Sequence, residues 1–167
     1  GSIGKEVAKR FKAFEMKVIG YRRGNIAEYG FDQIITTQNE LDEALKISDY
    51  VILALPLTDD TVGMFDMSKL SLMKQTAILI NVSRGQVVNQ EDLYIALSRK
   101  MIRGAGLDVT TPEPLPETHP LWRLDNVYIT PHNASSSPYM RERLYQMIVM
   151  NLTRYLQGLP VKYQIDK

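Results

Sequence analysis

The stretch YVILAL at residues 50–55, closed by Pro56, decides the fold class of this chain. A continuous apolar run of this length, followed by a turn residue, is typical of a strand buried on both faces of a parallel sheet. A second run of the same kind, TAILINV, covers residues 76–82. Such strands need helices on both sides of the sheet, so the two runs predict an α/β protein with a doubly wound, Rossmann-type parallel sheet.

The segments around these two runs alternate between helical and extended patterns. Apolar residues at helical spacing predict a helix over 4–14, and further helices are expected over 39–46, 66–73 and 89–100, the last with Asn89 as its N-cap. Further strands are predicted at 17–21 (KVIGY), 32–36 (DQIIT), 102–109 (IRGAGLDV) and 126–130 (NVYIT). A long helix over about residues 137–157, opened by Ser137-Pro138 and stopped by Gly158, closes a single domain over residues 1–167.

Composition narrows the possible functions. The 167 residues are 44% hydrophobic and 23% charged, as expected for an ordinary globular domain, and the net charge of +1 argues against nucleic acid or anionic membrane as a partner. The absence of cysteine excludes disulfides and thiol chemistry, and a metal site is not expected with only His119 and His132. No apolar run has the length of a membrane span and no signal-peptide core is visible, so we expect a cytoplasmic protein.

Three chemically useful side chains follow predicted strands. Arg84 comes after TAILINV, Glu113 lies in the loop after GAGLDV, and His132 follows VYIT. Each alone is more often a solvated or turn residue, but a doubly wound sheet gathers the carboxyl ends of its strands at one edge. Together they suit reduction of a 2-oxo acid. A guanidinium holds the carboxylate, an imidazolium protonates the carbonyl oxygen, and a carboxylate keeps that imidazole charged.

Four stretches identify a family resemblance: GSIGKEVAKRFKAFEMKVIGY (1–21), NVSRGQVVNQEDLYIAL (81–97), GAGLDVTTPEPLP (104–116) and HPLWRLDNVYITPH (119–132). In this order they resemble the coenzyme-binding domain of the D-isomer-specific 2-hydroxyacid dehydrogenases, which include glyoxylate/hydroxypyruvate reductases and phosphoglycerate dehydrogenases. The resemblance implies that Arg84 binds the substrate carboxylate and carbonyl, that His132 is the acid/base, and that Glu113 is its partner.

The resemblance also implies a coenzyme site, in which Asp108 faces the nicotinamide amide and the Val82 backbone lies beside the ring. The expected coenzyme-binding residues are Gly1, Ser2, Ile3, Gly4, Arg22, Arg23, Leu55, Pro56, Thr61, Val82, Ser83, Asp108, His132 and Ala134. No metal is implied.

The implied function is NAD(P)H-dependent reduction of a small 2-oxo acid to the D-2-hydroxy acid. This chain would be the coenzyme-domain portion of a homodimeric enzyme, and the substrate domain would be absent from it. The alternative is a non-catalytic, coenzyme-sensing protein like the corepressors that resemble this family. A third possibility is a folded remnant that neither binds coenzyme nor turns over. The sequence does not identify the 2-oxo acid.

Two arginines indicate the coenzyme. NAD enzymes place an acidic residue at the end of the strand after the glycine turn, where it accepts hydrogen bonds from the ribose hydroxyls. Here that position is Arg22, followed by Arg23. Two guanidiniums would bind a 2′-phosphate, so NADP(H) is favoured and NAD(H) remains possible. The alternative is that both arginines are solvated loop residues.

The first residues, GSIG, raise the question of a missing strand. Gly1 and Gly4 are interpreted as the second and third glycines of a dinucleotide fingerprint rather than as a tag. The strand before them would lie mid-sheet, where each unpaired buried backbone group costs about 1–3 kcal/mol. We therefore expect a longer polypeptide, a strand swapped from another copy, or direct pairing of 17–21 with 50–55. This chain alone is expected to reduce no 2-oxo acid.

Two residues or segments depart from the family pattern. Glu15 stands where a glycine usually ends the first helix, so a left-handed conformation is expected there at a cost of about 1 kcal/mol. NASSS at 133–137 replaces a glycine-rich stretch after His132, which leaves the shape of the pocket near His132 open.

Overall fold

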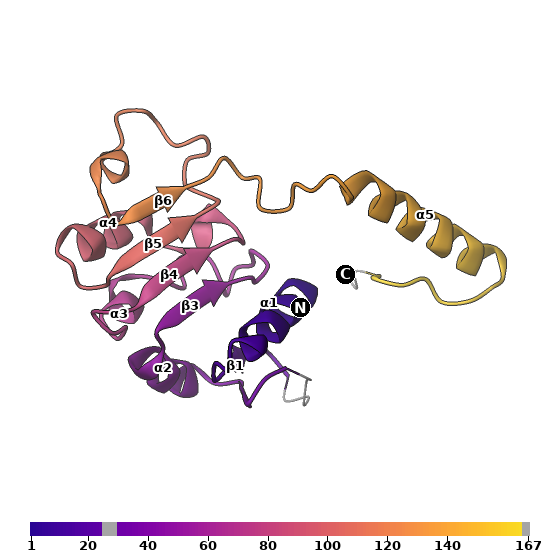
Figure 1. The fold of residues 1–167 in the computed structure, drawn as a ribbon, viewed down its shortest axis with the longest axis horizontal. Helices are drawn as coiled ribbons and strands as arrows, with labels where there is room; N and C mark the ends of the chain where they lie inside the picture. The colour runs from indigo at the N-terminus through magenta and orange to yellow at the C-terminus, as the bar shows by residue number, and fades with distance from the viewer. Residues whose placement is uncertain (25–29, 165–167) are drawn as a thin grey trace. The chain divides into compact units, whose positions relative to one another are not determined.

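Parallel strands form two separate sheets in the computed structural model, which describes residues 1–24 and 30–164. The larger sheet has the order β3 (Tyr50–Leu53), β4 (Ile78–Asn81), β5 (Gly104–Leu107) and β6 (Val127–Ile129), as Figure 1 shows. The smaller sheet pairs β1 (Ile19–Tyr21) with β2 (Gln33–Ile35). Every pairing between these strands is parallel. With its flanking helices this is the predicted Rossmann-type α/β fold.

The helices alternate with the strands, as the sequence predicts. They are α1 (Ser2–Ala13), α2 (Gln38–Ile47), α3 (Met67–Leu70), α4 (Gln90–Ser98), and the 3-10 turns η1 (Gly85–Val87) and η2 (Pro120–Arg123). The Asn89 side chain accepts a hydrogen bond from the Asp92 N–H, so the predicted cap is confirmed. Thr37 and Glu40 cap α2 reciprocally. In the described ranges, no helix is long and apolar enough to cross a membrane.

The larger sheet is covered unequally on its two faces. One face carries Leu53, Leu79 and Leu107, all buried in the main core. The register row of the opposite face joins Ile52, Ile80, Gly106 and Tyr128, and Tyr128 is 79% exposed. The prediction that YVILAL is buried on both faces is therefore wrong. Tyr50 is exposed and Ile52 only half-buried because the described chain covers this face poorly, and Ile80 on the central strand β4 is half-buried for the same reason.

The two sheets are separate because β1 and β3 do not pair. β1 is hydrogen-bonded to β2, and β3 to β4, so the expectation of direct pairing between 17–21 and 50–55 is wrong. Side chains bridge the separation instead. The ring of Phe11 on α1 lies 6.4 Å from the ring of Tyr50, and Arg23 reaches the loop after β3.

The small sheet is tied to α1 by Asp32, which lies just before β2. The Lys12 ammonium is 2.8 Å from one carboxylate oxygen of Asp32, and the Val18 N–H donates to the other at 2.7 Å. The hydrogen bond from Lys12 and, after it, the one from Val18 hold the pKa of Asp32 below its ordinary value. The Asp32 carboxylate is therefore charged at neutral pH, as its ion pair with Lys12 requires.

The chain divides into two compact units, Gly1–His132 and Asn133–Lys167, and the second contains α5 (Met140–Leu156). No residue of α5 is buried in the described chain. Gly158 has φ = 69°, which confirms the predicted stop. The helix starts later than the predicted 137, because the Tyr139 N–H and the Met140 N–H bond back to Ser137 in a preceding turn. Beyond the helix, Asn151 exchanges two hydrogen bonds with the backbone of Lys162.

Glu15 has φ = 60°, so the left-handed conformation expected after α1 is confirmed. Replacing it with glycine should raise the free energy of unfolding by up to about 1 kcal/mol, because glycine adopts this conformation without steric cost. Urea denaturation measures the change. Glu15→Ala is the matched control, since alanine keeps the Cβ and should give no gain. An equal effect of both substitutions would contradict the explanation by strain.

Candidate functional site

An open pocket of about 410 Å³ lies where the first turn of α1 meets the loops after β3 and β4. Its lining residues are Ile3, Ala54, Leu55, Pro56, Leu57, Val82, Ser83 and Arg84. Six of these were singled out from the sequence: Ile3, Leu55, Pro56, Val82, Ser83 and Arg84. Parallel strands bring these segments together, because the carboxyl ends of β3 and β4 meet at one edge of the sheet.

The first turn of α1, which borders this pocket through Ile3, is chemically suited to an anion. No side chain caps the helix in the described chain, and its first turn holds no acidic residue. The backbone N–H groups and the positive end of the helix dipole suit a pyrophosphate there. A Cβ built on Gly1 or Gly4 meets no described atom within 4 Å. Packing inside the described chain therefore requires glycine at neither position.

A buried asparagine shapes the loop that presents Arg84. Asn81, 1% exposed at the end of β4, accepts hydrogen bonds from the Ser83 N–H at 3.0 Å and the Ser83 hydroxyl at 2.7 Å. Its amide also donates to the Arg84 carbonyl at 3.0 Å. The exposed Arg84 side chain donates to the Ser83 carbonyl at 2.7 Å. Asn81 thus closes a tight turn that directs Arg84 outward, with further guanidinium donors unpaired among the described residues.

Two contacts hold the loop after β5 against this turn. A Cβ added to Gly85 would lie 2.0 Å from the Thr110 carbonyl oxygen, so only glycine permits this close approach. Gln90, in the first turn of α4, donates to the Thr111 carbonyl at 2.6 Å and accepts from the Thr111 N–H at 2.8 Å. The loop that carries Glu113 is therefore fixed to the segment that follows Arg84.

Glu113 and His132 form a hydrogen-bonded pair. The Nδ1 atom of His132 lies 2.5 Å from a carboxylate oxygen of Glu113, and the two side chains are 44% and 39% exposed. The carboxylate accepts from Nδ1, so the opposite ring nitrogen, Nε2, is the one that can exchange a proton with a ligand. The Thr130 hydroxyl donates at 2.5 Å to Asp108, which is buried directly after β5.

Some predicted coenzyme-binding residues lie outside the lining of this pocket. The Thr61 hydroxyl is used inside its own loop, where it accepts from the Thr58 N–H and donates to the Pro56 carbonyl, both at 2.8 Å. Arg22 and Arg23 follow β1, and the Arg22 N–H donates to the Ile35 carbonyl at 3.1 Å. Ser2 lies in the first turn of α1, and Ala134 belongs to the second compact unit.

Sequence reasoning missed three residues that position this site. Asn81 and Gln90 fix the two loops, and Thr130 bonds to Asp108. A signal existed only for Asn81, which is a polar residue at the end of an otherwise apolar run and therefore needs a partner when it is buried.

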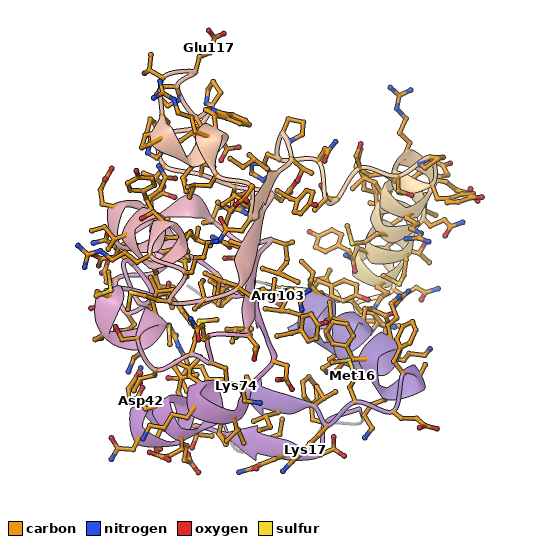
Figure 2. The ribbon with its side chains drawn as sticks, turned by 60° about the vertical axis from the view of Figure 1, so that its left-hand side comes forward. Met16, Lys17, Asp42, Lys74, Arg103 and Glu117 are labelled. Carbon is orange, nitrogen blue, oxygen red and sulfur yellow. The ribbon has the colours of Figure 1, made fainter. Side chains whose placement is uncertain are left out.

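A second open pocket, of about 360 Å³, lies at the opposite ends of the strands. It is lined by Gln75, Lys100, Ile102, Arg103, Asp125 and Asn126. Arg103, labelled in Figure 2, immediately precedes β5. No residue singled out from the sequence lines this pocket, so it serves as a reference region for the experiments below.

A family model and curated relatives that match this chain all describe 2-hydroxyacid dehydrogenases or glyoxylate reductases. Residues 1–134 match the family model described as "D-isomer specific 2-hydroxyacid dehydrogenase, NAD binding domain". A glyoxylate reductase of Korarchaeum cryptofilum is 42% identical over 95% of this chain and 47% of its own length. The glyoxylate reductase/hydroxypyruvate reductase of Homo sapiens is 38% identical over 99% of this chain and 50% of its own. The chain thus spans about half the length of these curated relatives.

A solved structure matches over nearly the whole chain. It is the NADPH-dependent glyoxylate/hydroxypyruvate reductase of Sinorhizobium meliloti, in complex with NADP and sulfate. The two chains superpose with a TM-score of 0.89 at 30% identity, over 99% of this chain and 53% of the other.

Gly85→Ala should lower the free energy of unfolding by about 1–3 kcal/mol or more, because the new methyl group meets rigid backbone at Thr110. Thermal denaturation followed by circular dichroism measures the loss. Gly106→Ala is the matched control: its Cβ would meet only the Ile80 side chain, at an ordinary 3.9 Å. If both variants melt at the temperature of the unmodified protein, the close approach at Gly85 does not hold this loop in place.

Proposed function

Because this chain belongs to the D-isomer specific 2-hydroxyacid dehydrogenases, we propose that the protein reduces a small 2-oxo acid to the D-2-hydroxy acid with NAD(P)H. The observation that carries the proposal is the His132–Glu113 pair, held at 2.5 Å on loops that follow β6 and β5. The similarity to relatives named glyoxylate reductase or glyoxylate reductase/hydroxypyruvate reductase supports a 2-oxo acid as small as glyoxylate or hydroxypyruvate.

The proton chemistry falls to His132. As an imidazolium, it donates the proton from Nε2 to the carbonyl oxygen of the substrate, which becomes the hydroxyl oxygen of the product. The Glu113 carboxylate accepts from Nδ1 and so stabilises the charged ring before the transfer and orients it throughout. The nicotinamide coenzyme, when bound, supplies the hydride that adds to the carbonyl carbon. In the oxidative direction, neutral His132 takes the hydroxyl proton back.

Arg84 binds the substrate carboxylate. Its guanidinium extends from the turn closed by Asn81 and borders the pocket at the carboxyl edge of the sheet. A planar fork of N–H donors matches a carboxylate in two parallel hydrogen bonds, which fixes the orientation of the neighbouring carbonyl. This role explains why the loop backbone around Arg84 is held by a buried side chain.

The coenzyme is NADP(H) in this proposal, with NAD(H) as the alternative. The first turn of α1 and the pocket beside it hold the pyrophosphate and the nicotinamide half, and Arg22 and Arg23 bind the 2′-phosphate. The solved Sinorhizobium meliloti relative, described as NADPH-dependent, supports this preference.

Three further parts of the proposal rest on family membership. Residues 1–167 act as the coenzyme domain, and a separate domain of the intact enzyme contacts the substrate side chain. The enzyme works as a homodimer, and it works in the cytoplasm. The name of the matching family model, which covers residues 1–134, supports the first of these.

Turnover of glyoxylate and hydroxypyruvate by the intact protein tests the proposal. Arg84→Ala and His132→Ala should each lower kcat by at least about 100-fold, because they remove carboxylate binding and proton donation in the transition state. The coenzyme dissociation constant should change only a few-fold. Arg103→Ala, at the opposite ends of the strands, is the matched control and should leave both quantities unchanged.

Unaltered turnover of His132→Ala across the pH range would refute the assigned acid, and a coenzyme-sensing protein would show no turnover at all.

The coenzyme preference is tested at position 22. The unmodified protein should favour NADPH over NADH by at least about tenfold in kcat/KM, which corresponds to about 1.4 kcal/mol. Arg22→Asp should erase or invert this ratio, because a carboxylate repels the 2′-phosphate and accepts hydrogen bonds from ribose hydroxyls. Arg103→Asp, with the same change of charge, should preserve the ratio. Equal use of both coenzymes by the unmodified protein would refute the NADP(H) assignment.

A further inference from the structure

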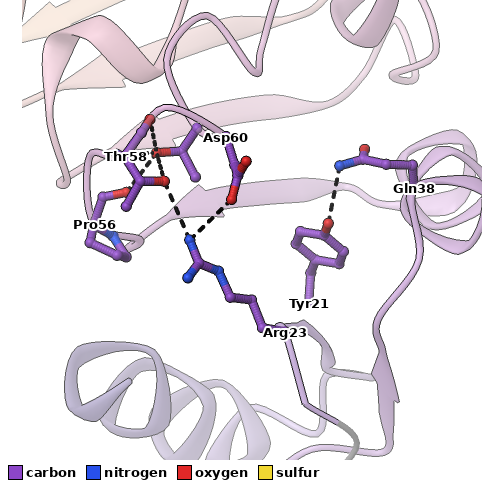
Figure 3. A network of polar contacts seen from close by, with 7 residues as sticks. Tyr21, Arg23, Gln38, Pro56, Thr58 and Asp60 are labelled. Carbon is purple, nitrogen blue, oxygen red and sulfur yellow. Dashed lines mark hydrogen bonds and ion pairs between the residues drawn. The ribbon is translucent and has the colours of Figure 1, made fainter. Parts of the chain in front are cut away.

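The guanidinium of Arg23 already has an anionic neighbour in the described structure. Its Nη2 atom lies 3.4 Å from the Thr58 hydroxyl and 3.4 Å from a carboxylate oxygen of Asp60, as Figure 3 shows. The Arg23 and Asp60 side chains are 75% and 83% exposed. Exposed ion pairs of this geometry contribute only modestly to stability, so another anion can displace the carboxylate but has to compete with it.

The position of Asp60 is set by its own loop. The Thr61 hydroxyl accepts from the Thr58 N–H and donates to the Pro56 carbonyl, which folds residues 56–61 into a compact turn. This turn follows β3, whereas Arg23 follows β1, so the contact joins the two sheets. Among the described residues no other carboxylate is within ion-pair distance of Arg23, which makes Asp60 the competitor for that guanidinium.

We propose that Asp60 is a specificity-determining residue that weakens binding of the 2′-phosphate by occupying and neutralising Arg23. The inference rests on the proposed function, because it assigns Arg23 to the 2′-phosphate of NADP(H). A phosphate that binds the same guanidinium must displace the Asp60 carboxylate and then remain close to it. A bare ribose 2′-hydroxyl carries no charge and meets no such repulsion.

The expected effect is modest because the site is open to water. Removing the negative charge of Asp60 should tighten binding of a 2′-phosphate about three- to tenfold and leave a ligand without that phosphate unchanged. The Debye length is about 8 Å at physiological ionic strength, so the gain should shrink as salt is added. In Asp60→Asn, Thr58 and the amide oxygen at position 60 can both still accept from Arg23, so the guanidinium loses a charged partner but no hydrogen-bond acceptor.

The experiment compares 2′,5′-ADP with 5′-AMP by isothermal titration calorimetry on the unmodified protein, Asp60→Asn and Asp59→Asn. Asp60→Asn keeps the size and the hydrogen-bonding oxygen of the side chain, and should raise the preference for 2′,5′-ADP about three- to tenfold. Asp59→Asn removes one negative charge from the neighbouring exposed position and should change the preference less than about twofold.

The outcomes separate this inference from the proposed function. If the unmodified protein prefers 2′,5′-ADP but Asp60→Asn behaves like Asp59→Asn, the role of Asp60 is refuted and the coenzyme assignment stands. If the unmodified protein shows no preference and Asp60→Asn creates one, Asp60 acts as proposed and the assignment of NADP(H) fails. A weaker preference in Asp60→Asn would show that Asp60 orients Arg23 for binding, which also overturns the inference.

Discussion

Parallel pairing of β3, β4, β5 and β6 is the constraint on which the site depends. The register aligns Leu53 with Asn81, and Asn81 with Leu107, so these strands end level with one another. Whatever follows them in the sequence must emerge at the same edge. Arg84, Glu113 and His132, which lie on three different loops, reach the same edge of the sheet for this reason alone.

Alignment of strand ends does not by itself fix side chains, and local hydrogen bonds supply the rest. Asn81 closes the Arg84 turn from a buried position, and Gln90 clamps the backbone of Thr111. Gly85 lets these two loops approach at a distance that no side chain would permit. Arg84, Glu113 and His132 are exposed, whereas Asn81 and Gly85 are buried and Gln90 is half-buried in the first turn of α4. A site built this way keeps its geometry while its surface stays open to a ligand.

The sequence predicted the features that follow from hydrophobic patterns and family motifs. It missed contacts between residues that are far apart in the sequence. The alternation of apolar runs with helical patterns was sufficient to predict the parallel sheet. The family resemblance predicted that Glu113 is the partner of His132. The left-handed Glu15 was also foreseen. Burial of Ile52 was overestimated, because an apolar run carries no information about whether another element covers the second face of its sheet. The contact between Arg23 and Asp60 joins residues 37 positions apart on exposed loops, and no local sequence pattern predicts it.

The central claim is that a dinucleotide binds along the carboxyl edge of the strands. Backbone amide chemical shifts during titration with NADPH test it most directly. The perturbed amides should be those of Ile3, Leu55, Val82 and Ser83 at the larger pocket, together with Arg22 and Arg23 after β1. Amides of Gln75, Ile102 and Asn126, at the amino ends of the strands, should remain unchanged. Perturbations centred on that second pocket, or none at the first turn of α1, would contradict the account.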